Sequence, residues 1–95
     1  MAKRPELAEA IPFRFFKNRR KDVVAVTLQP FTPAGKETIN VVDVRLFAMD
    51  RSGANVPTPK GVSMSVNRLP DLHEAVTKAL KKAQELGLLD GGDDE

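Results

Sequence analysis

Hydrophobic positions along the chain follow two different periods, one before residue 67 and one after it. In the first part, apolar residues alternate with polar ones or form short runs, which is the period of two that β-strands show. This alternation predicts strands at 13–17, 23–28, 38–49 and 62–66. Pro30 and Pro33 are expected to end the second strand, because proline donates no backbone hydrogen bond.

After residue 67 the apolar residues recur at the three- and four-residue spacing of an amphipathic helix. Asn67 is a preferred N-cap residue, Pro70 is tolerated in a first helical turn, and Gly87 is a typical stop. The predicted order is therefore β-β-β-β-α. This order predicts an α+β fold, in which a four-stranded antiparallel sheet carries one C-terminal helix on one face.

The predicted strand 38–49 has two different faces. One face is apolar and is assigned to the core, where the helix is expected to pack on Val42, Val44 and Leu46. The other face is apolar at Ile39 and Val41 but charged and aromatic at Arg45 and Phe47. A strand covered on one side only is polar throughout its other face. The apolar end of this mixed face therefore suggests a second cover, such as another subunit.

Composition restricts the chemistry more than it restricts the fold. The 95 residues fit one domain, and the absence of cysteine excludes a disulfide scaffold, a thiolate metal site and a cysteine nucleophile. His73 is the single histidine, and no glycine-rich phosphate loop is present. We expect a binding protein and not an enzyme, with no cofactor and no metal. Without a membrane-length apolar run or a signal-peptide core, a cytoplasmic protein is expected.

The net charge of +2 hides an asymmetry, because residues 1–68 carry a net +6 and residues 69–95 a net −4. Five basic residues and no acid lie between positions 14 and 21, beside three phenylalanines. They are Arg14, Lys17, Arg19, Arg20 and Lys21, with Phe13, Phe15 and Phe16. Cations neutralise phosphates and ring faces stack on unpaired bases, so this run suits a nucleic-acid strand. The alternative is a solvated basic turn with its phenylalanines in the core.

Several short segments together resemble the positive cofactor four family of transcriptional coactivators, which bind single-stranded DNA. The matching segments are KNRR at 17–20, VVAVTL at 23–28, DVR at 43–45, DRSG at 50–53 and PTPKGVSM at 57–64, followed by the closing helix. The resemblance covers roughly residues 13–86. It implies a strongly curved sheet and a homodimer, whose sheets form channels for two DNA strands or for the melted part of a duplex.

The resemblance also implies which side chains contact DNA. Arg45 matches the strand-borne arginine of the family, and Lys60 matches the lysine before the glycine of the fourth strand. The alternative roles are pairing with Asp43 for Arg45 and a solvated loop position for Lys60. Together with the basic run, the expected nucleic-acid-binding residues are Lys17, Arg19, Arg20, Phe31, Lys36, Arg45, Phe47 and Lys60.

One departure from the family concerns base stacking. Well-known members carry a tryptophan three residues after the arginine, where this chain has Ala48, and the chain has no tryptophan or tyrosine. Stacking would then fall to Phe31 or Phe47, or be weaker. For both phenylalanines a place in the core is the alternative.

The sequence as a whole predicts a leader at 1–12, a domain at 13–89 and a flexible acidic tail at 90–95. The expected function is homodimeric binding of single-stranded DNA with little sequence preference, in transcription regulation or genome maintenance. RNA and melted duplex are alternative ligands, the transcription machinery is a further partner, no membrane is involved, and a bacterial member would associate with the nucleoid. The rival hypothesis is a dimeric protein-interaction module that docks on transcription or replication machinery, and a third is recognition of double-stranded DNA.

Overall fold

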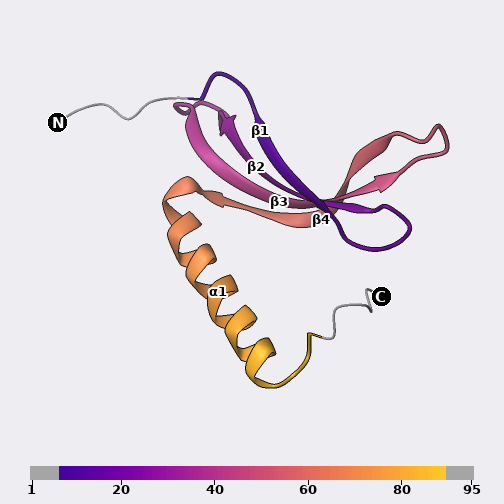
Figure 1. The fold of residues 1–95 in the computed structure, drawn as a ribbon. Coiled ribbons are helices and arrows are strands. Elements are labelled where there is room, and N and C mark those ends of the chain that lie inside the picture. Colours follow the sequence, from indigo (N-terminus) through magenta and orange to yellow (C-terminus); the bar gives the residue numbers. More distant parts are fainter. Residues whose placement is uncertain (1–6, 90–95) are drawn as a thin grey trace.

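The computed structural model describes residues 7–89 as a four-stranded antiparallel sheet followed by one helix (Figure 1). The strands follow chain order in the sheet, and a 3₁₀ turn joins the last strand to the helix. The elements are β1 (Ile11–Phe16), β2 (Val23–Phe31), β3 (Ile39–Met49), β4 (Asn55–Ser65), η1 (Val66–Arg68) and α1 (Leu69–Glu85). The β-β-β-β-α layout is confirmed. The first half of the predicted leader and the acidic tail at 90–95 lie outside the described residues.

Three strands extend through prolines that the sequence analysis placed outside them. Pro12 lies in β1, Pro30 lies in β2, and β4 begins at Asn55, seven residues before its predicted start. Both β1 and β4 are edge strands, where proline is tolerated because one side has no partner. Pro30 also has one side without a partner, because β1 pairs with β2 only as far as Leu28. The prediction that Pro30 ends the second strand is therefore wrong.

Strand pairing gives the sheet an apolar face and a second face that we call the groove face. One row of paired residues on the apolar face consists of Phe13, Val26, Val44 and Val62. The neighbouring row on the groove face consists of Arg14, Ala25, Arg45 and Gly61. Alternation along each strand extends these two faces over the whole sheet. The predicted separation of β3 into an apolar and a mixed face is confirmed.

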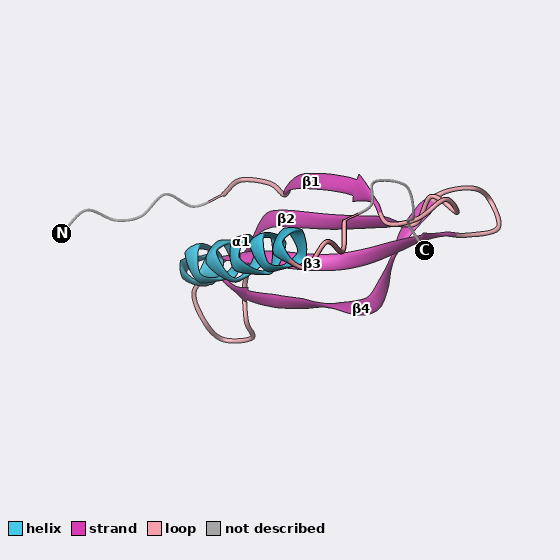
Figure 2. Cartoon of the chain, turned by 60° about the horizontal axis from the view of Figure 1, so that its bottom comes forward, coloured by secondary structure: helices cyan, strands magenta, loops and turns pink. Residues whose placement is uncertain are grey.

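The helix does not cover the sheet. Figure 1 shows α1 leaving the end of β4 and diverging from the strands, and Figure 2 shows it in front of the sheet; none of its residues is buried. Within the helical segment, the short η1 turn contacts β3. The prediction that the helix packs on Val42, Val44 and Leu46 is therefore wrong, although Val42 itself is fully buried.

The start of the helix explains this geometry. Ser65 ends β4 and also caps η1, where its Oγ accepts a hydrogen bond from the backbone N–H of Asn67 at 3.2 Å. No loop therefore separates β4 from the helical segment, and the chain has no room to fold back over the strands. The N-cap of α1 is Arg68 and makes no side-chain cap bond, so the prediction of Asn67 as the helix N-cap is wrong. Pro70 lies in the first turn, as predicted.

Large apolar side chains are consequently exposed on the apolar face of the sheet and on the helix. On the apolar face of the sheet Phe13 is 61% exposed, and on the helix Leu80 is 50% exposed. Soluble proteins rarely leave contiguous apolar patches of this kind uncovered unless the patches bind something. Between residues 7 and 89 no helix has the length and apolar character needed to cross a membrane.

Candidate nucleic-acid interface

A hollow of about 480 Å³ lies on the groove face and is bounded by residues of all four strands. Ala25 forms part of its floor and is only 1% exposed. Arg14 and Arg45 stand on either side of Ala25 in the same row, on β1 and β3. Because neighbouring strands lie about 4.8 Å apart, the two arginine backbones are about 10 Å from each other. The hollow is therefore flanked by two long basic side chains.

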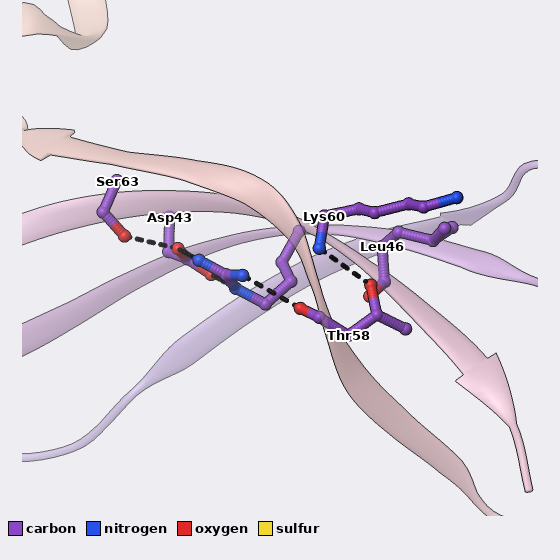
Figure 3. Close-up of polar contacts among 6 residues, drawn as sticks. Asp43, Leu46, Thr58, Lys60 and Ser63 are labelled. Atoms are coloured by element: carbon purple, nitrogen blue, oxygen red, sulfur yellow. Dashed lines mark hydrogen bonds and ion pairs between the residues drawn. The ribbon is translucent and has the colours of Figure 1, made fainter.

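Arg45 is held by three hydrogen bonds. Its Nε and Nη2 donate to the two carboxylate oxygens of Asp43 at 3.0 and 2.9 Å, and its Nη1 donates to the backbone oxygen of Thr58 at 2.9 Å. Asp43 also accepts a hydrogen bond from the Ser63 hydroxyl, on the neighbouring strand (Figure 3). A guanidinium has five N–H donors, so two remain after these bonds. The pairing of Asp43 with Arg45 is confirmed.

Both members of this pair are charged. The hydrogen bond from Arg45 holds the pKa of Asp43 below its usual value, against the opposing effect of burial, and Ser63 lowers that pKa further. The hydrogen bond to Asp43 likewise raises the pKa of Arg45. Arg45 Nη2 and Asp43 Oδ1 lie 2.9 Å apart, so the carboxylate compensates the positive charge of the guanidinium. Arg45 therefore presents fixed N–H donors to the groove, with little net charge.

Gly61 is the residue over which Arg45 lies. A Cβ atom added at Gly61 would come within 2.6 Å of the Val44 backbone oxygen and 2.9 Å of Arg45 Cζ. Real Cβ atoms essentially never approach other heavy atoms this closely. The glycine is required by the close approach of β3, and this explains why glycine follows Lys60 in the fourth strand.

A bulge in β4 lies beside the Arg45–Gly61 pair. Arg45 pairs with Gly61 and Phe47 pairs with Pro57, so β4 uses more residues than β3 to cover the same length. The Thr58 hydroxyl closes the bulge by donating to the Leu46 backbone oxygen at 2.8 Å. Bulges redirect side chains, and Figure 3 shows Lys60 extending away from the Asp43–Ser63 contact. Lys60 is exposed and does not line the hollow.

The basic turn between β1 and β2 is rigidly built. Asn18 is only 5% exposed, and its Oδ1 accepts hydrogen bonds from the backbone N–H groups of Arg20 and Asp22 at 3.0 and 3.3 Å. Lys21 takes a left-handed backbone conformation, with φ of 68°, to complete the turn. Arg19 and Arg20 are exposed on it, and Lys17 precedes it. These basic residues thus form a defined surface directly beyond the end of β1.

The other expected contact residues divide between the two ends of the groove face. Phe47 lines the hollow and pairs with Val23, beside the basic turn. Phe31 pairs with Ile39 at the far end of β2, about 26 Å away along an extended strand. Phe31 is 50% exposed, so its assignment to the core does not hold within this chain. Lys36 lies beyond Phe31, in the turn closed by its backbone N–H and the Pro33 oxygen at 3.0 Å.

Two groove-face residues were not predicted as contacts. Arg14 lines the hollow, and Phe16, which is 67% exposed, shares a row with Val23 and Phe47. Both belong to the basic and aromatic run that the sequence analysis noted, but the run alone did not show which of its members share a face. The register of β1 against β2 would have selected them, because Arg14 pairs with the small residue Ala25.

Comparison with protein families, with curated proteins and with solved structures finds no match to this chain. The proposed resemblance therefore depends on the short segments quoted above. Within residues 7–89, no three His, Asp or Glu side chains are grouped so that they could hold a metal ion.

We predict that Gly61→Ala lowers the free energy of unfolding by about 1–3 kcal/mol, because overpacking at this close approach forces β3, β4 or Arg45 to move. Urea unfolding followed by circular dichroism measures this change. The control is Lys60→Ala, at an exposed position on the same strand, which should change stability by less than about 0.5 kcal/mol. Equal stability of the Gly61→Ala variant and the original protein would contradict the close approach.

We also predict a pH dependence from Asp43. Its pKa is lowered by folding, so the stabilisation is present above the ordinary value of 3.8 and is lost as the pH falls through the folded-state pKa. Asp43→Asn should cost about 2 kcal/mol at pH 7 and progressively less below pH 3.8. Urea unfolding at pH 7 and at pH 3 tests this. A constant difference between the two proteins would show that the ion pair does not stabilise the fold.

Proposed function

We propose that this protein binds single-stranded nucleic acid, with DNA as the first candidate, on the groove face of its sheet. The observation that carries the proposal is the row of Arg14, Ala25, Arg45 and Gly61 beside the ring of Phe47. Proteins that bind single strands without sequence preference combine a basic groove with aromatic rings on which bases stack. The groove face offers both kinds of group on a floor of small residues.

Each group has a different role in this proposal. Arg14 and the basic turn with Arg19 and Arg20 neutralise phosphates, and Arg45 donates its two remaining N–H groups. Phe47 stacks on a base, and Phe16 on the same row offers a second ring about 10 Å away. Phosphates and ring faces carry little sequence information, so we expect little sequence preference. Phe31 and Lys36 would contact the strand further along.

We propose further that a second copy of the chain covers the exposed apolar surfaces. The apolar face of the sheet and the apolar side of α1 are both uncovered in the single chain, with Phe13, Val76 and Leu80 all at least half exposed. A homodimer that pairs these surfaces would bury them together and leave both groove faces accessible. Two grooves would then bind two strands or the two strands of a melted duplex.

The second candidate function is a protein-interaction module. The exposed apolar side of α1 is the observation that favours it, because an amphipathic helix can dock into a groove on another protein. Transcription or replication machinery would be the partner. Under either function the proposed setting is transcription regulation or genome maintenance, in the cytoplasm or at a bacterial nucleoid.

We predict that unlabelled oligo-dT displaces a fluorescent oligo-dT from the protein at much lower concentration than a duplex of the same length. Phe47→Ala should weaken binding about tenfold, since one stacked base contributes roughly 1–3 kcal/mol. Val56→Ala, on the same sheet but outside the groove, is the matched control and should bind normally. Equal competition by the duplex would favour double-strand recognition, and no binding would favour the interaction module.

We predict that the protein sediments with twice the mass of one chain and that Leu80→Glu converts it to a monomer. The reason is that a carboxylate on the apolar side of α1 cannot be buried without a partner. Lys78 lies on the side of the helix opposite to Leu80, so Lys78→Glu should leave the dimer intact. Sedimentation equilibrium measures both variants, and a monomeric original protein would contradict the dimer.

A further inference from the structure

The groove contains one acidic and two basic side chains, and their arrangement decides where its positive charge lies. Asp43, Arg14 and Arg45 all line the hollow. Asp43 is buried beside Arg45 and contacts it through both carboxylate oxygens. A bidentate pair of this kind is geometrically specific and strong. Any phosphate that approached Arg45 for its charge would have to compete with a carboxylate already fixed at 2.9–3.0 Å.

Arg14 differs from Arg45 in every relevant respect. It lies on the edge strand β1, its side chain is exposed, and it makes no ion pair with any other residue between 7 and 89. It stands opposite Ala25, whose small side chain separates it from Arg45. Two arginines about 10 Å apart can both reach a group that sits above Ala25. Arg14 brings a full charge to that position, whereas Arg45 brings directed donors.

We propose that a backbone phosphate of the nucleic acid binds above Ala25, where Arg14 supplies the charge and Arg45 supplies only hydrogen bonds. Asp43 acts as the internal counter-ion of Arg45. It holds the guanidinium in place and compensates its positive charge. This inference rests on the proposed binding of single strands and assigns roles within the same groove. Arg14 is then the side chain of the groove that attracts the phosphate by its charge. Asp43 limits the electrostatic attraction because it compensates the charge of Arg45.

Salt dependence separates the two roles. Each phosphate neutralised on a single strand contributes about −0.7 to the slope of log K against log salt concentration, because counterions are released. One such contact changes the ratio of Kd at 200 mM to Kd at 50 mM salt by about 2.6-fold. A hydrogen bond from a neutralised guanidinium changes Kd at every salt concentration but leaves this ratio unchanged.

The experiment measures Kd for a fluorescent oligo-dT between 50 and 200 mM NaCl, by anisotropy, for the original protein and four variants. Arg14→Gln should reduce the Kd ratio about 2.6-fold, and Asp43→Asn should increase it by the same factor because Arg45 becomes a free cation. The double variant Asp43→Asn with Arg45→Gln removes both charges. It should weaken binding several-fold at each salt concentration and keep the original ratio.

Lys81→Gln is the matched control, since it removes one exposed positive charge from the helix, away from the groove, and should change neither Kd nor the ratio. Circular dichroism confirms that each variant is folded before binding is measured. A reduced ratio in the double variant, with an unchanged ratio in Arg14→Gln, would overturn the inference and assign the charge to Arg45. Failure of the original protein to bind oligo-dT at any salt concentration would instead overturn the proposed function.

Discussion

The close approach of the neighbouring strands β3 and β4 at Gly61 is the constraint on which the groove face depends. Only a residue without a side chain leaves room for the Arg45 guanidinium over the neighbouring strand, where it contacts Asp43 and Thr58. The bulge at Thr58–Lys60 lies beside this pair, and Lys60 extends away from the Asp43–Ser63 contact. Ala25 continues the row of small residues onto β2. Together these features place two arginines and a phenylalanine around a hollow, on a sheet whose other face is apolar.

The proposed binding and the proposed dimer use different faces of the same sheet. A single helix that leaves the sheet directly from β4 covers little of either face. The groove face tolerates exposure because it carries arginines and an internal ion pair, whereas the apolar face does not. One surface is thus suited to a charged polymer and the other to a second chain. The two proposals are physically independent, since each depends on a different face.

Local patterns predicted the order of elements, the two faces of β3 and the end of the helix at Gly87. They failed where tertiary context decides the outcome. Pro30 was expected to end the second strand, and the fourth strand was expected to start after Pro57, but both prolines lie within strands. Their tolerance depends on which strand edges are unpaired, and the sequence does not show this. The direction of α1 follows from the direct connection of β4 to η1 at Ser65, without a loop between them. Pairing of Arg45 with Asp43 was one of the two roles expected for Arg45, whereas selection of Arg14 from the basic run required the register with Ala25.

The central claim is that the row containing Arg14, Ala25 and Arg45 binds a single strand while Arg45 stays fixed by Asp43. NMR of the arginine side-chain Nε–H groups during an oligo-dT titration tests it most directly. The account predicts that Arg45 Nε–H gives a slowly exchanging signal in the free protein, since it donates to Asp43, and that Arg14 and Arg45 both shift on binding. A rapidly exchanging Arg45 signal, or shifts confined to residues outside the groove face, would contradict it.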